Sequence, residues 1–169
     1  AVNYLTINII LARILPVSTI GIFNIANSIL AFFTFFSDIG LAAALIQKKE
    51  ITKEDIKTTF TIQEILAFII SASVWIAAPF FANFYNLDEA GLWLIRALAV
   101  SFFLVSLKVI PSVLLERDLR FRPLVTVEVL ESIIFNSILI WLTFINFGVN
   151  AFSIAAISRA VIGATSIFL

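Results

Sequence analysis

Long apolar runs dominate this sequence and limit the folds open to it, because a spanning helix needs about 20 mostly apolar residues. The runs predict an all-α, polytopic transmembrane bundle that forms a single transmembrane domain. Its six expected helices lie at 4–15, 19–46, 53–84, 91–115, 124–144 and 151–169. We expect the first and last to be truncated. The second is too long for one straight span, so we expect it to bend near 38–40.

Two other folds fit the sequence poorly. A transmembrane β-barrel would show alternating segments of about 10 residues, whereas these runs are longer and continuously apolar. A water-soluble domain is about 25% charged, and this chain is only 13% charged. With so few polar groups, a soluble fold could not cover its surface, so we expect lipid to surround the chain.

Composition excludes several functions. The sequence has no cysteine and no histidine, which removes thiolate catalysis, disulfides and the commonest metal ligands. Eleven basic residues balance eleven acidic residues, and no basic tail indicates a nucleic-acid partner. We therefore expect no cofactor and no metal. Methionine is also absent, so we expect Ala1 not to be the native start and the chain to be a fragment.

The loops predict an orientation, since basic residues favour the cytoplasmic side. The segments that join the second to the third helix and the fourth to the fifth are basic, whereas the inter-helix segments 85–90 and 145–150 lack Lys and Arg. This pattern predicts a cytoplasmic amino terminus. The basic residues are Lys48, Lys49, Lys53, Lys57, Arg117, Arg120 and Arg122. Arg13, near the expected outer end of the first helix, is the exception. Thr52 and Asp55 fit a helix-capping pair, and the segment 116–123 reads as a solvated loop.

Five segments, taken in order along the chain, resemble motifs of bacterial polysaccharide flippases. They are 12–16 (ARILP), 38–48 (DIGLAAALIQK) followed by 52–55 (TKED), 79–85 (PFFANFY), 111–121 (PSVLLERDLRF) and 148–152 (GVNAF). Each is weak alone, but together they span nearly the whole chain. The sequence thus resembles the polysaccharide transporter and O-antigen flippase group (Wzx-like, TuaB-like) of the multidrug/oligosaccharidyl-lipid/polysaccharide exporter superfamily. Asn150 and the segment 20–22 depart from the pattern and leave the subgroup open.

The resemblance implies twelve to fourteen helices in two lobes around a cavity in the bacterial cytoplasmic membrane. This chain would form most of the amino-terminal lobe, and its partners would include the missing carboxy-terminal lobe. Such proteins are thought to flip undecaprenyl-pyrophosphate-linked oligosaccharides to the outer leaflet by alternating access, without enzymatic chemistry. A drug or metabolite exporter of the same superfamily is an alternative. A membrane-embedded enzyme of envelope glycan assembly is another, although the outward loops are short.

Charges inside spans usually face the bundle interior or a cavity, so they are the candidate cavity residues. Lys108 is expected either to meet the pyrophosphate as a cavity cation or to form an ion pair with Glu64, Glu128 or Glu131. Arg13 is expected to contact substrate or to snorkel to the outer interface. Arg159 lies deep enough in the last span to be a further cavity cation.

Carboxylates and amides complete the candidates. Asp38 is expected to gate transport or to cap a helix. Glu128 and Glu131 share a helix face, so with Glu64 they could couple transport to H⁺ or Na⁺, or the two could be hydrated at the cytoplasmic interface. Asn24 and Asn27 in the second span could hydrogen-bond sugars or support close helix packing.

Overall fold

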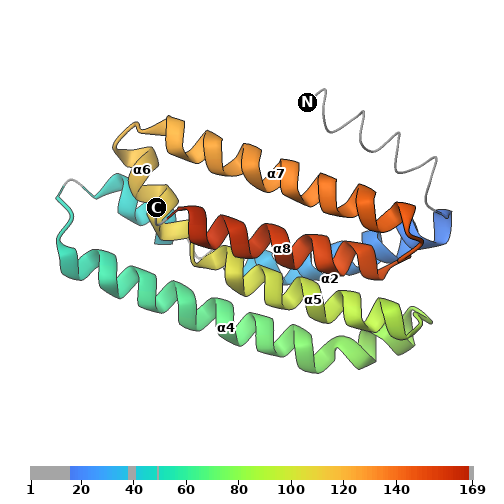
Figure 1. Cartoon of the computed structure of the whole chain (residues 1–169). Helices are drawn as coiled ribbons and strands as arrows, with labels where there is room; N and C mark the ends of the chain where they lie inside the picture. Colours follow the sequence, from blue (N-terminus) through green and yellow to red (C-terminus); the bar gives the residue numbers. More distant parts are fainter. Residues whose placement is uncertain (1–15, 38–40, 49, 168–169) are drawn as a thin grey trace.

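The computed structural model describes residues 16–37, 41–48 and 50–167, and every regular element among them is an α-helix. The helices are α2 (Val17–Ser37), α3 (Leu41–Gln47), α4 (Lys53–Phe84), α5 (Glu89–Ser106), α6 (Val109–Arg117), α7 (Phe121–Phe144) and α8 (Asn150–Ser166). Figure 1 shows the long helices running side by side as a bundle. The predicted all-α bundle is confirmed.

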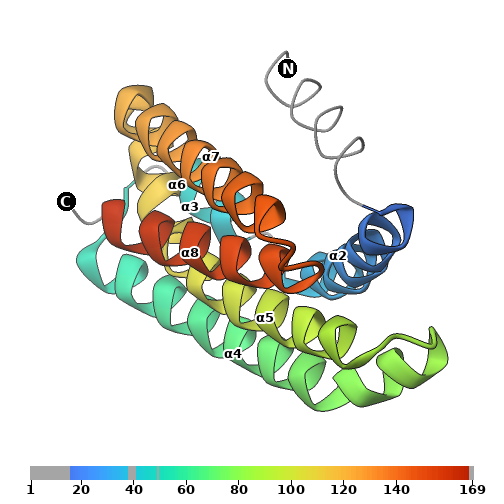
Figure 2. The ribbon, with the colours of Figure 1, turned by 45° about the vertical axis from the view of Figure 1, so that its right-hand side comes forward.

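Helix α5 lies at the centre of the bundle, where it packs against α2, α4 and α8, while α7 packs against the other side of α8 (Figures 1 and 2). Leu94 and Ile95 of α5 are buried against Leu139 of α7 and Phe152 of α8 in one core cluster. Helix α8 presents small buried residues along this contact, at Ala151, Ala155, Ala156, Ala160, Gly163 and Ala164. Small side chains allow backbones to approach closely, as is typical of membrane bundles.

Three segments of the described chain are long and apolar enough to cross a membrane: Lys53–Phe84, Glu89–Arg117 and Phe121–Phe144. Val17–Phe33 is apolar but shorter. Large apolar side chains cover the outer face of α4, where Ile76 is 77% exposed. An apolar outer surface suits contact with lipid, and this chain is a membrane protein.

The fourth predicted helix, 91–115, is two helices in the structure. Helix α5 ends at Ser106 and α6 begins at Val109. Pro111 has no backbone N–H to donate to the carbonyl of Leu107, and its ring disfavours a regular helix there. The chain instead tightens, with the Lys108 N–H donating to the Val105 carbonyl at 3.2 Å. The predicted span is thus one apolar segment, Glu89–Arg117, with a local break at Leu107 and Lys108.

The segment 116–123 is also shorter as a loop than predicted. Helix α6 extends to Arg117 and α7 begins at Phe121 rather than at 124. Pro123 lies in the first turn of α7, where a missing N–H costs no intrahelical hydrogen bond. Only Asp118, Leu119 and Arg120 remain between the two helices.

Two local sets of contacts stabilise the end of the bundle at which α4 begins. Thr52 and Asp55 form the predicted capping box at the start of α4, and Lys48 forms an ion pair with Asp55 at 2.6 Å. Arg117 of α6 donates from Nη1 to the carbonyls of Leu45 at 2.6 Å and Lys48 at 2.5 Å. The guanidinium thus satisfies carbonyls at the end of α3. The predicted first span, 4–15, and the predicted bend at 38–40 lie outside the described residues.

Candidate functional site

The break between α5 and α6 sets the position of Lys108. Lys108 is the residue that precedes α6, and its side chain is 17% exposed. Its ammonium group contacts the Oε1 atom of Glu131, which lies on α7. A lysine inside an apolar bundle is costly unless an anion compensates it, and Glu131 supplies that anion.

Glu131 joins three segments of the bundle through one carboxylate. Its Oε1 atom accepts from Lys108, and its Oε2 atom accepts from Nε of Arg159 on α8 at 3.3 Å. The Glu131 side chain is 1% exposed, whereas that of Arg159 is 49% exposed. We call Lys108, Glu131 and Arg159 the central ion cluster.

The cluster has two cations for one carboxylate, so it keeps an excess positive charge. Arg159 contacts Glu131 through Nε alone, although a guanidinium has five N–H donors. Its Cζ atom lies 6.0 Å from the ring centroid of Phe135. The two Nη groups are therefore available to another anion on the exposed side of the cluster.

Gly163 makes room for the buried carboxylate. It lies four residues after Arg159, on the same face of α8. A Cβ atom placed on Gly163 would lie 2.8 Å from Cδ of Glu131 and closer still to Oε1. Any larger residue would therefore displace the carboxylate. Sequence reasoning missed this glycine, although its spacing from Arg159 was a usable signal.

Glu64 lies on α4 and joins the end of α5 rather than the central ion cluster. Its Oε2 atom accepts a hydrogen bond of 2.9 Å from the hydroxyl of Ser106, two residues before Lys108. Its Oε1 atom is buried and has no hydrogen-bond partner among the described residues. Ser106, which is 2% exposed, is a second contact that the sequence did not indicate.

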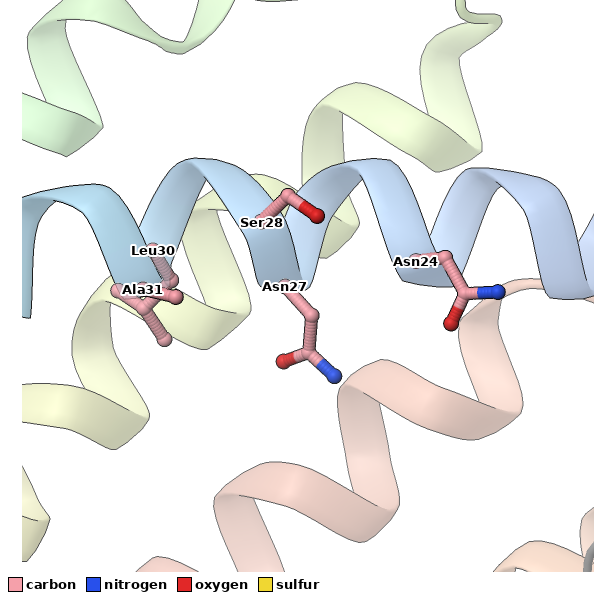
Figure 3. Close-up of a pocket in the computed structure, with 5 residues that line it drawn as sticks. All are labelled: Asn24, Asn27, Ser28, Leu30 and Ala31. Carbon is pink, nitrogen blue, oxygen red and sulfur yellow. The ribbon is translucent and has the colours of Figure 1, made fainter.

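Asn24 and Asn27 line a separate hollow beside α2, of about 560 Å³. All of its lining residues come from this one helix, and Ser28, Leu30 and Ala31 complete it. In Figure 3 both asparagine amides point away from the same side of α2. Both side chains are exposed, so these amides can meet a ligand that enters the hollow.

The remaining candidates lie apart from the central ion cluster. Glu128 is exposed on α7, whereas Glu131, three residues later, is buried. The alternative that both glutamates are hydrated at the cytoplasmic interface was therefore wrong for Glu131. The reason is that α7 turns Glu131 towards Gly163 of α8. Arg13 and Asp38 lie outside the described residues. Within the part of the chain that the structure describes, no group of acidic residues could hold a metal ion.

Comparison with known proteins identifies a family for the chain. Residues 10–169 match the family described as "Polysaccharide biosynthesis protein". The teichuronic acid biosynthesis protein TuaB of Bacillus subtilis (strain 168) is 25% identical over 97 residues, covering 57% of this chain and 20% of that protein. No solved structure matches the chain. Because the family match spans nearly the whole sequence, the chain belongs to this family of polysaccharide biosynthesis proteins, which is the Wzx-like transporter family that its motifs resemble.

Proposed function

We propose that this chain is part of a transporter that moves a lipid-linked oligosaccharide from the cytoplasmic to the outer leaflet of the bacterial inner membrane. The substrate class is an undecaprenyl-pyrophosphate-linked glycan. Family membership and the apolar helices support a polysaccharide transporter. The name of the matched relative, a teichuronic acid biosynthesis protein, supports an envelope glycan as cargo.

The central ion cluster is the observation on which the proposal rests. A lipid diphosphate needs cations on its path, because anionic groups are poorly solvated in hydrocarbon. Lys108 and Arg159 supply two cations, and both are held by one buried carboxylate, Glu131. Arg159 suits a phosphate because its planar fork matches phosphate oxygens.

The depth of the cluster supports its role. Lys108 lies nine residues before Arg117, and Glu131 lies ten residues after Phe121. At 1.5 Å per residue, the cluster therefore lies about 14–15 Å from the end of the bundle where α6 meets α7. From the other end, Arg159 lies nine residues into α8, or about 14 Å. A hydrocarbon core is about 30 Å thick. The cluster thus lies near the midplane, where transporters place substrate sites.

The mechanism is one of anion exchange. At rest, Glu131 pairs with both Lys108 and Arg159 and balances one of their two positive charges. An arriving diphosphate displaces the carboxylate from Arg159 first, because Arg159 is the more exposed cation. Meanwhile the amides of Asn24 and Asn27 are placed to hydrogen-bond sugar hydroxyls. Alternating access between this lobe and the rest of the protein then carries the bound headgroup across.

We propose that three carboxylates, Glu131, Glu64 and Glu128, couple transport to the movement of an ion. Glu131 releases both cations when another anion displaces it. The Oε1 atom of Glu64 is buried and has no hydrogen-bond partner among the residues that the structure describes, so Glu64 can take up a proton or contribute to a sodium site. Glu128 is the exposed member of the group. We propose H⁺ or Na⁺ coupling through these residues, with the basic loops and the amino terminus in the cytoplasm.

The test uses full-length protein in proteoliposomes with an undecaprenyl-pyrophosphate-linked oligosaccharide, and a glycosidase that reports glycan in the outer leaflet. We expect Lys108→Ala and Arg159→Ala each to slow translocation by about tenfold or more, because each loses a charged contact to phosphate. Lys108→Arg keeps the charge and should retain more activity. Arg122→Ala, an exposed basic residue at the start of α7, is the matched control.

Three outcomes would contradict the proposal. Wild-type rates in both alanine variants would remove the central ion cluster from the substrate path. A wild-type protein that exports drugs but leaves the glycan in place would favour the drug-exporter alternative. A glycan that is chemically changed during the assay would favour an enzyme of glycan assembly.

A further inference from the structure

Arg96 lies between two tryptophans, away from the central ion cluster. Its Cζ atom is 5.2 Å from the ring centroid of Trp75 on α4 and 5.1 Å from that of Trp93, one turn earlier on α5. The two rings meet edge to face, with centroids 6.4 Å apart. Two cation–π contacts hold the guanidinium in place. They do not neutralise its charge.

Arg96 has no anion within the described part of the chain. It forms neither an ion pair nor a hydrogen bond there, and its Nε atom is buried without a partner. A guanidinium stays charged in proteins. Lys108, by contrast, pairs with Glu131. Arg96 therefore presents unsatisfied N–H donors that a phosphate would fit.

The surroundings of Arg96 are those of a lipid-facing surface. Trp75 is 38% exposed and Trp93 is 47% exposed, and beside them on α4 lie Phe68, which is 61% exposed, and Ile76, which is 77% exposed. No charged side chain interrupts α4 between Glu64 and Phe84. A soluble anion would have to cross this apolar surface, whereas a lipid already lies against it.

The depth of Arg96 suits a headgroup. It lies seven residues from Glu89, the first residue of α5, which is about 10 Å along the helix. An arginine side chain can extend towards the membrane interface, where tryptophans are also enriched. Asp88, the carboxylate of the 85–88 loop, accepts a hydrogen bond from the Gly91 N–H at 2.9 Å.

We propose that Arg96, Trp75 and Trp93 form a binding site for the phosphate of a membrane phospholipid in the leaflet next to the 85–88 loop. The guanidinium donates to the phosphate oxygens, the indoles line the site, and the acyl chains lie along the exposed apolar face of α4. This site is independent of the transport proposal, because it shares no residue with the central ion cluster or with the hollow beside α2.

The experiment measures phosphatidylglycerol bound to the full-length protein by native mass spectrometry, after titration into delipidated protein. Arg96→Gln removes the charge and keeps a polar side chain, and Arg96→Lys keeps the charge without the planar fork. We expect the apparent affinity of one site to fall about tenfold in Arg96→Gln and less in Arg96→Lys. Arg122→Gln, at the opposite end of the bundle, is the matched control and should bind as the wild type does.

Competition measurements distinguish a site for a lipid phosphate from a site for a soluble phosphate. Excess inorganic phosphate should not displace the lipid, and displacement would show a site for a soluble anion, overturning the proposal. Equal lipid binding by the wild type and a folded Arg96→Gln variant would also overturn it. So would unchanged lipid binding with a large loss of thermal stability, since Arg96 would then pair with a carboxylate elsewhere in the protein. If Arg96→Gln does not fold, Arg96→Lys decides: a measurable loss of lipid affinity relative to the wild type supports the site, and wild-type affinity overturns it.

Discussion

Replacing Glu131 by glutamine removes the anion that pairs with Lys108 and Arg159 in the described part of the chain. Breaking a buried ion pair by removing one partner costs about 3–5 kcal/mol. Glu131 is 1% exposed, but Lys108 is 17% and Arg159 is 49% exposed, so the cations can recover part of their hydration. We therefore expect Glu131→Gln to lower the free energy of unfolding by about 3 kcal/mol, the lower end of that range.

A double-mutant cycle with Lys108→Met separates the ion pair from other effects. The methionine keeps an apolar stem of similar length, and Glu131 keeps Arg159 as its partner, so we expect this single change to cost about 1–3 kcal/mol. In the double variant one buried cation and its anion are both gone. We expect the double cost to fall short of the sum by about 1–3 kcal/mol, the range for residues in direct contact.

The measurement is unfolding of the full-length protein by a denaturing detergent in mixed micelles, followed by tryptophan fluorescence. Glu128→Gln is the matched control, because it makes the same chemical change three residues earlier at an exposed position; it should shift stability by less than about 0.5 kcal/mol. A cost for Glu131→Gln below about 1 kcal/mol would refute the central ion cluster as a stabilising contact. Additivity within about 0.5 kcal/mol would refute its coupling to Lys108.

Three further changes test other contacts in the same unfolding assay. Gly163→Ala should cost about 1–3 kcal/mol by forcing a Cβ against Glu131, and it should slow translocation; wild-type behaviour in both would mean that the carboxylate has room to move. Arg117→Ala should cost about 2 kcal/mol through loss of its charge-assisted hydrogen bonds to the Leu45 and Lys48 carbonyls, with faster trypsin cleavage near Lys48 as a second readout; an unchanged cleavage rate would contradict the role of Arg117. Leu119→Gly should stabilise the protein by about 1 kcal/mol, because glycine adopts a positive φ without strain. Leu119 has a φ of 56° and is 75% exposed. A loss of stability would show that the leucine side chain makes a stabilising contact.

The sequence alone predicted the class of fold, because membrane spans are local properties. Long apolar runs indicate helices whichever way they pack, and the capping box at Thr52 and Asp55 depends on residues three apart. The break near Lys108 was only partly predictable. A proline such as Pro111 disfavours a regular helix, but whether the helix bends or stops at Leu107 depends on how the freed carbonyl is satisfied.

The family could also be predicted from the sequence, since motif order and spacing are linear properties. Residues 10–169 match the polysaccharide biosynthesis family that the motifs resemble. Other predictions rested on distant contacts. Lys108 and Glu131 are 23 residues apart, and Arg159 lies 28 residues beyond Glu131, so only the packing of α7 and α8 against the α5–α6 break brings them together.

Glu128 and Glu131 show where tertiary structure decided the outcome. The two are the same residue type, three apart on one helix, and the sequence treats them alike. The structure buries Glu131 and leaves Glu128 exposed, because α7 meets α8 where Gly163 leaves space for a carboxylate. Helical periodicity determined that both glutamates lie on neighbouring faces of α7; the rotation of α7 against its neighbour determined which of them became the anion of the central ion cluster.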